Sequence, residues 1–223
     1  MQDRFWLVGN HLAVDFVNTV LGTDLRTEAL HDWGDVLRFL VRAGALTERE
    51  ARRVRRQTRR EHAEAAAYAA ALSLRDMVRE LVTERASGKA PALESISRLN
   101  LELEAAATYP QIRETDEGWW LEDLPVNRSW SGALGRIALA AAGLAVRGAG
   151  SIRKCANPEC ILYFRDASQA QVRRWCSMAV CGNRAKVAAH ARRATETSIR
   201  SRVSTPRGQL AADASTPRIL AKP

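Results

Sequence analysis

The stretch that decides the fold of the C-terminal part is residues 153–184, which read RKCANPECILYFRDASQAQVRRWCSMAVCGNR. Cys155 and Cys160 enclose four residues, Cys176 and Cys181 enclose another four, and fifteen residues separate the two pairs. Four thiolates held as two close pairs can form the tetrahedral sulfur shell that structural zinc prefers. The spacing therefore predicts one Zn²⁺ ion bound by these four cysteines.

Two disulfides or four unrelated buried thiols are the alternatives to a metal site. The sequence shows neither a secretory signal nor an apolar run long enough to cross a membrane, so we expect a cytoplasmic protein without membrane contact. Disulfides are rare in that compartment, and unrelated cysteines are not expected to concentrate with symmetric spacing. A shell of four thiolates leaves no open coordination position, so the predicted zinc is structural.

The residues around the cysteines indicate a small α+β module. Pro158 favours a tight knuckle between the first two cysteines, and 161–164 and 172–175 flank a polar turn as the strands of a hairpin would. Helical spacing resumes near Ser177 or Met178. Knuckle, hairpin and helix in that order predict a treble-clef-like zinc finger over residues 151–196.

The excess positive charge lies in the same part of the chain. The net charge of the protein is +9. Residues 1–150 hold 20 Lys and Arg against 21 Asp and Glu, whereas residues 151–223 hold 14 against 4. A polyanionic partner is therefore expected at the C-terminal end.

A basic helical face is predicted after the last cysteine. Side chains three or four residues apart share that face, namely Asn183, Lys186, His190 and Arg193. Arg184 lies beside it, and Arg173 and Arg174 precede the second cysteine pair. Arginine can donate two parallel hydrogen bonds to phosphate, so these seven residues are candidates for binding nucleic acid, with double-stranded DNA as the expected form.

Blander interpretations of this charge stay open. Four thiolates with zinc carry a formal charge of −2, so a few of these cations could simply neutralise the site, and a charged helix is often only a solvated surface. An RNA-associated or protein-docking finger is the alternative function. No Gly-rich phosphate loop, nucleophile motif or open metal site is apparent, so we do not expect an enzyme.

The sequence pattern of residues 1–150 predicts a helical domain with one short β-hairpin, so the whole chain is expected to be mainly α. Asn10 is a candidate cap for a helix that ends near Gly22, Asp32 for one that ends near Gly44, and Thr47 with Glu50 forms a capping-box pattern. The remaining predicted elements are helix 48–86 with a bend near 58–61, helix 93–107, a hairpin within 111–123, and a buried helix 131–146.

Two polar clusters in this domain have alternative interpretations. His11, Asp15 and Asn18 share one helical face and are candidates for a pocket that binds an unidentified small-molecule effector, or for a hydrogen-bond cluster that fixes packing. Seven arginines between residues 49 and 60 could contact phosphate, but flanking glutamates favour a solvated helix. Residues 197–223 predict a disordered basic tail.

The run Cys181-Gly182-Asn183-Arg184, after Arg174-Trp175-Cys176, closely resembles the CGNR zinc finger, over about 153–195. The opening Gly9-Asn10-His11-Leu12-Ala13-Val14-Asp15-Phe16-Val17-Asn18-Thr19 is similar to the start of the ABATE domain that commonly precedes that finger. The resemblance implies a stress-induced transcription regulator in which a helical, sensor-like domain is followed by a DNA-binding finger with the four cysteines as zinc ligands. A homodimer is a reasonable default for a regulator, although no sustained heptad pattern supports one.

Overall fold

The structure is a computed structural model that describes residues 5–21, 27–147 and 150–203. It divides into two compact units, Met1–Gly182 and Asn183–Pro223. Among the described residues, no helix is both long enough and apolar enough to cross a membrane.

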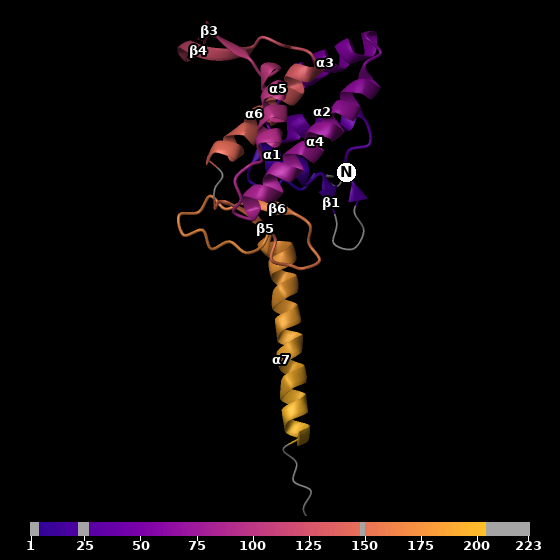
Figure 1. The fold of residues 1–223 in the computed structure, drawn as a ribbon, viewed down its shortest axis with the longest axis vertical. Helices are drawn as coiled ribbons and strands as arrows, with labels where there is room; N and C mark the ends of the chain where they lie inside the picture. The colour runs from indigo at the N-terminus through magenta and orange to yellow at the C-terminus, as the bar shows by residue number, and fades with distance from the viewer. Residues whose placement is uncertain (1–4, 22–26, 148–149, 204–223) are drawn as a thin grey trace, which may run out of the picture. The chain divides into compact units, whose positions relative to one another are not determined.

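The first unit is built mainly from helices that pack around α1, α4 and α6 (Figure 1). Its helices are α1 (Leu12–Val17), α2 (Trp33–Arg42), α3 (Glu48–Arg60), α4 (Glu64–Ala86), α5 (Leu93–Glu104) and α6 (Trp130–Arg147). Its strands are β1 (Val20–Leu21), β2 (Thr27–Glu28), β3 (Thr108–Thr115), β4 (Gly118–Pro125), β5 (Ile152–Lys154) and β6 (Tyr163–Arg165). The largest fully buried side chains of the helical core include Phe16, Trp33, Phe39, Leu40, Val78, Leu134 and Ile137.

The predicted caps of α2 and α3 are confirmed, whereas Asn10 does not cap α1. The N-cap residue of α1 is His11, and its side chain makes no capping hydrogen bond. The Asp32 carboxylate accepts a hydrogen bond from the Asp35 N–H, which opens α2. Thr47 and Glu50 form the reciprocal capping box of α3. The predicted bend lies between α3 and α4, where His62 adopts a positive φ of 51°.

The first helix is shorter than the sequence predicts. It ends at Val17, and Val20 and Leu21 pair with Glu28 and Thr27 in a small antiparallel ladder. The Arg75 side chain of α4 fixes this ladder because it makes a bidentate ion pair with Glu28 at 2.8 and 2.6 Å and donates to Thr19 Oγ1 at 2.9 Å.

The predicted hairpin is confirmed and is longer than expected. Strands β3 and β4 pair in antiparallel register from Thr108 with Pro125 to Thr115 with Gly118, and Gly118 takes the turn at φ 119°. Both faces are largely exposed, and on one of them Ile112, Trp119 and Leu121 are 67%, 71% and 72% exposed. The hairpin therefore contributes little to the hydrophobic core of the first unit.

The cysteine-bearing segment is part of the first unit. Its hairpin differs from the predicted one, because β6 pairs with β5, which precedes the first knuckle, and residues 172–175 form no strand. The predicted domain boundary at 150 thus falls inside one compact unit.

The second unit contains α7 (Asn183–Val203). This helix continues past residue 196, the predicted end of the zinc module, so residues 197–203 are helical and not part of a disordered tail. The rest of the predicted tail, 204–223, lies outside the described residues.

Candidate metal centre and nucleic-acid surface

The four cysteine Sγ atoms lie within 4.8 Å of one another, and all four residues are buried. Cys176 Sγ is 3.8 Å from Cys160 Sγ and 3.6 Å from Cys181 Sγ, and all four cysteines are free of disulfides. A disulfide would bring two sulfurs to about 2.05 Å. Zinc–sulfur bonds of about 2.3 Å at the tetrahedral angle place sulfurs about 3.8 Å apart, so the spacing fits a zinc cage.

Short backbone contacts hold each pair of cysteines in place. The Cys160 N–H donates to Asn157 O at 2.9 Å and closes the first knuckle, and the Cys155 N–H donates to Leu162 O at 3.0 Å. The second pair ends in a π-helical turn, Met178–Gly182, in which the Gly182 N–H donates to Ser177 O. A Cβ on Gly182 would lie 2.6 Å from Met178 Sδ, so the flexible and exposed Met178 side chain would have to shift to admit a larger residue here.

Polar groups around the cage favour thiolate ligands. The Cys176 N–H donates to Cys155 Sγ at 3.4 Å, and Asn157 Nδ2 donates to Cys181 Sγ at 3.7 Å. A hydrogen bond from Cys176 lowers the pKa of Cys160 to about 5, and the same contact raises the pKa of Cys176. Cys160 therefore ionises readily, and a bound cation favours ionisation of Cys176 and Cys181, whose pKa values are raised.

The metal-binding segment is tied to the helical domain by partly buried hydrogen bonds. Asn18 Nδ2 donates to Tyr163 O at 2.8 Å, and Asn18 Oδ1 accepts from the Tyr163 N–H at 3.0 Å. The Arg165 N–H donates to Gly9 O at 2.7 Å. The N-terminal segment and α1 thus complete the hydrogen bonding of β6.

Arg173 is partly buried, and its guanidinium makes contacts within the protein, while its predicted role at a nucleic-acid surface stays a prediction. Its Nε donates to Trp175 O at 3.0 Å, and its Nη2 donates to Val8 O at 2.8 Å and to Cys176 O. The guanidinium also lies over the Phe164 ring, 4.3 Å from the centroid. The group therefore clamps the second cysteine pair to the N-terminal segment. Arg174 is exposed beside Trp175.

Asp166 is a site residue that sequence reasoning missed. Its carboxylate accepts from the Ser168 N–H and hydroxyl at 3.1 and 2.6 Å and from the Arg173 N–H at 2.9 Å. The hydrogen bond from the Ser168 hydroxyl is the main cause that lowers the pKa of this carboxyl group. Asp166 thus folds the loop between the two cysteine pairs, and an Asp two residues before a Ser was the available signal.

The candidate effector residues make packing contacts. Asp15 Oδ1 accepts from the Gly9 N–H at 2.7 Å, and Asn18 holds Tyr163. Burial raises the pKa of Asp15 to about 6 and, with Arg165 nearby, lowers the pKa of His11. The cavity beside this region is lined by Asn10 and residues of the metal-binding segment, but by none of the three. Asp15 and Asn18 make the contacts of the hydrogen-bond cluster, the second interpretation of this motif, whereas His11 Nδ1 is shielded from solvent and has no hydrogen-bond partner among the described residues.

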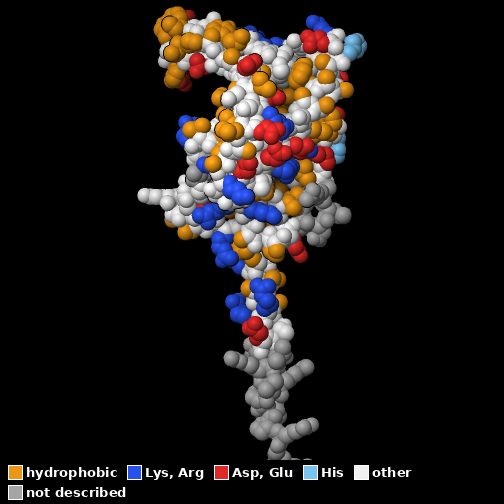
Figure 2. Space-filling model, in the orientation of Figure 1, with side chains coloured by type: hydrophobic (Ala, Val, Ile, Leu, Met, Phe, Trp, Pro, Cys, Tyr) orange, Lys and Arg blue, Asp and Glu red, His pale blue; other side chains and the backbone are white. Residues whose placement is uncertain are grey.

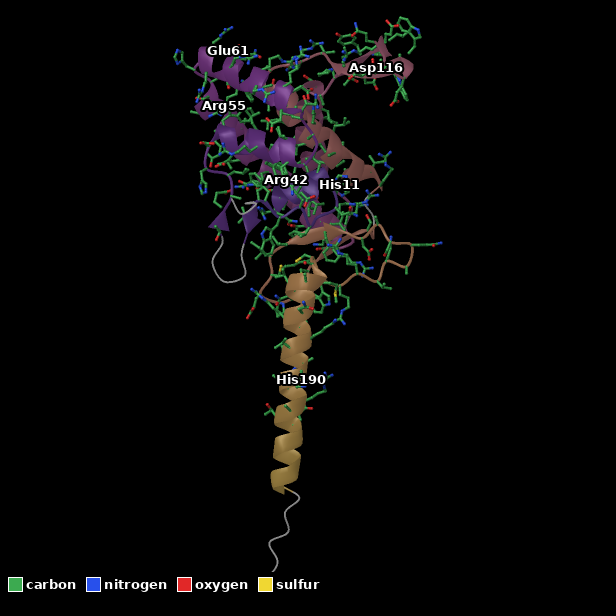
Figure 3. The ribbon with its side chains drawn as sticks, turned by 180° about the vertical axis from the view of Figure 1, so that it is seen from behind. His11, Arg42, Arg55, Glu61, Asp116 and His190 are labelled. Carbon is green, nitrogen blue, oxygen red and sulfur yellow. The ribbon has the colours of Figure 1, made fainter. Side chains whose placement is uncertain are left out.

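The remaining candidate nucleic-acid residues lie on α7. The side chains of Asn183, Arg184, Lys186, His190 and Arg193 are all exposed. In an α-helix, Lys186, His190 and Arg193 share one face, whereas Arg184 and Arg192 point elsewhere. Figure 2 shows Lys and Arg side chains along the described part of this helix, and Figure 3 labels His190 on it. Alanines fill much of the rest, so helix propensity supports α7 without an apolar stripe.

A helical domain joined to a buried cage of four thiols defines this molecule as a structural-zinc protein. The family model ABATE, described as "Putative stress-induced transcription regulator", matches residues 10–148, and the CGNR zinc finger model matches residues 151–194. The chain belongs to the ABATE family and carries a CGNR zinc finger whose four cysteines bind structural Zn²⁺. No protein of curated function matches it.

Proposed function

We propose that this protein is a non-enzymatic transcription regulator that binds double-stranded DNA through α7. The observation that carries the proposal is the exposed basic helix that begins directly after the last zinc ligand. Its described side chains include four Lys or Arg residues, at 184, 186, 192 and 193, against the single carboxylate of Glu196. Because an exposed charged helix gains nothing from packing, contact with a polyanion accounts for its composition.

The zinc cage has a supporting part in this proposal. It contributes the folded π-helical turn Met178–Gly182 from which α7 starts, and its four ligands leave no coordination position for catalysis. The free thiols of all four cysteines support the cytoplasmic location that we propose, because disulfides are rare in that compartment. The segment also carries exposed cations of its own at Lys154, Arg165 and Arg174.

Salt-dependent DNA binding tests the proposal. Fluorescence anisotropy of the zinc-loaded full chain on random-sequence duplex DNA, between about 50 and 200 mM salt, should give affinity that falls steeply with salt. Lys186→Gln should flatten the slope of log K against log salt by about 0.9, the value for one lost phosphate contact. Arg192→Gln is the matched control, because it removes one exposed cation from another face of the same helix.

Two outcomes would count against DNA. Tighter binding to single-stranded RNA than to the duplex would favour the RNA-associated finger. Absence of binding to duplex DNA, single-stranded DNA and RNA would make α7 a protein-docking element. Equal slope changes for Lys186→Gln and Arg192→Gln would contradict the predicted binding face.

A further inference from the structure

A cleft of about 880 Å³ lies in the helical domain between α3, the C-terminal end of α5, the base of the β3–β4 hairpin and α6. Figure 1 shows α3 and the hairpin at the same end of this unit. The cleft is far along the chain from the cysteines and shares no lining residue with the metal centre. Its volume is within the range of small-molecule pockets, about 300–1,000 Å³.

Arginine dominates the charge of this cleft. Arg136 is paired with Glu50 at 2.6 Å, and Arg113 is paired with Glu122 at 2.9 Å. The other charged lining residues are Arg49, Arg53, Arg56, Arg128 and Asp123. Among the described residues, none of these four arginines has an ion-pair partner within 4.0 Å. Four cations therefore line the cleft with one unpaired carboxylate.

The arginines of α3 form a row along one helical face. Arg49, Arg53 and Arg56 follow spacings of four and three residues, which places them on the same side of the helix. At 1.5 Å per residue the row is about 10 Å long, longer than one phosphate group requires. The flanking glutamates do not pair with this row, since Glu50 holds Thr47 and Arg136, Glu48 pairs with Arg52, and Glu61 accepts from Gln57.

Arg53 adds a second, independent observation. Its Nε–H is shielded from solvent and has no hydrogen-bond acceptor among the described residues. A buried donor without an acceptor is unfavourable, and arginine N–H groups match phosphate oxygens in a bidentate geometry. The lining also includes the apolar side chains of Ala105, Ala106 and Leu139, an apolar wall against which an uncharged part of a ligand can pack.

We propose that this cleft binds a small phosphorylated molecule with at least two phosphate groups, of the nucleoside di- or triphosphate class. The phosphates contact the arginine row of α3 together with Arg128, and the nucleoside part packs against the apolar wall. This inference does not depend on DNA binding by α7, because all its residues belong to the helical domain.

Calorimetric titration of the zinc-loaded full chain with pyrophosphate and with ATP tests the inference. Both should bind, and the double variant Arg49→Gln/Arg56→Gln should weaken binding by about 100-fold, at about tenfold for each lost hydrogen bond to a charged group. The matched control is Arg55→Gln/Arg60→Gln. It removes two exposed arginines from the same helix that do not line the cleft, and we expect less than about a threefold change. Figure 3 labels Arg55 on α3.

Several results would overturn the inference: no binding of pyrophosphate or ATP by the wild-type chain, equal weakening in both double variants, or citrate bound as tightly as pyrophosphate. Duplex DNA affinity that falls in the cleft variant, without binding of the small phosphates, would make the cleft a nucleic-acid surface instead. If Arg49→Gln/Arg56→Gln fails to fold by circular dichroism, Arg128→Gln replaces it, since Arg128 lies in the loop before α6.

Discussion

Replacing Asn18 with alanine should weaken the joint between the helical domain and the metal-binding segment. Asn18 is 2% exposed, and its amide makes two hydrogen bonds to the backbone of Tyr163, at 2.8 and 3.0 Å. Asn18→Ala removes both and leaves the N–H and C=O of Tyr163 facing a side chain that can neither donate nor accept. The effect therefore falls on a strand that borders the zinc cage.

The expected loss follows from these two bonds. A net hydrogen bond contributes about 1 kcal/mol, and a buried partner left unsatisfied costs about 1–3 kcal/mol. Because Tyr163 is only partly buried, water can satisfy some of its backbone groups, so we expect the free energy of unfolding to fall by about 2–4 kcal/mol. That is a large fraction of the stability of about 5–15 kcal/mol typical of a domain.

Urea unfolding of the zinc-loaded chain, followed by circular dichroism, measures this loss as a shift in midpoint with little change in slope. The variant should also release zinc to a chelator faster than the wild type. Asn100→Ala is the control, because Asn100 is exposed on α5. Asn18→Asp should be at least as harmful as Asn18→Ala, since a carboxylate cannot donate to Tyr163 O. If Asn18→Ala and Asn100→Ala differ by less than about 0.5 kcal/mol, the joint does not depend on this amide.

Three further perturbations follow from the site. Cys160→Ser should abolish zinc binding, measured as metal content, and also lower the unfolding midpoint of the helices; unchanged zinc content would contradict the cage. Arg173→Lys should lower the free energy of unfolding by about 2 kcal/mol, because a lysine ammonium cannot reproduce the hydrogen bonds of the guanidinium. The variant should leave the salt slope of DNA binding unaltered, and a flattened slope would show that Arg173 contacts DNA. The pKa of Asp15 is raised from 3.8 to about 6, mainly by burial, so the folded state holds a proton that the unfolded state releases. The stability that Asp15 contributes, about 3 kcal/mol in total, should therefore be lost as the pH rises from below about 4 to above about 6, and Asp15→Asn should lack this component in unfolding measured across that range.

The local structure of the helical domain could be predicted because local chemistry determines it. The cap at Asp32 and the capping box at Thr47 involve residues three apart, and the helix break at His62 follows a stretch where the apolar spacing fails. The zinc ligands could also be predicted from the sequence, since two short loops bring the four thiols together.

Interactions between distant segments could not be predicted in the same way. Asn18 and Tyr163 are separated by 145 residues, and Arg173 and Val8 by 165, so nothing in either local sequence indicates its partner. In the metal-binding segment, the sequence predicts 172–175 as the second strand of the hairpin because that stretch has strand-like residues. The competing strand, β5, has only three residues and stands before the first cysteine, where a short apolar-basic run gives little signal.

The clamp made by Arg173 and the Asn18 amide has a practical consequence for anyone who builds chimeras of such proteins. Cutting the chain near residue 150 would separate strand β6 from the Asn18 amide that completes its hydrogen bonding, and the Arg173 guanidinium from the carbonyl of Val8. A finger excised there should bind zinc less firmly than the intact protein. Transplanting α7 alone, from Asn183 onward, would leave both contacts within the parent protein.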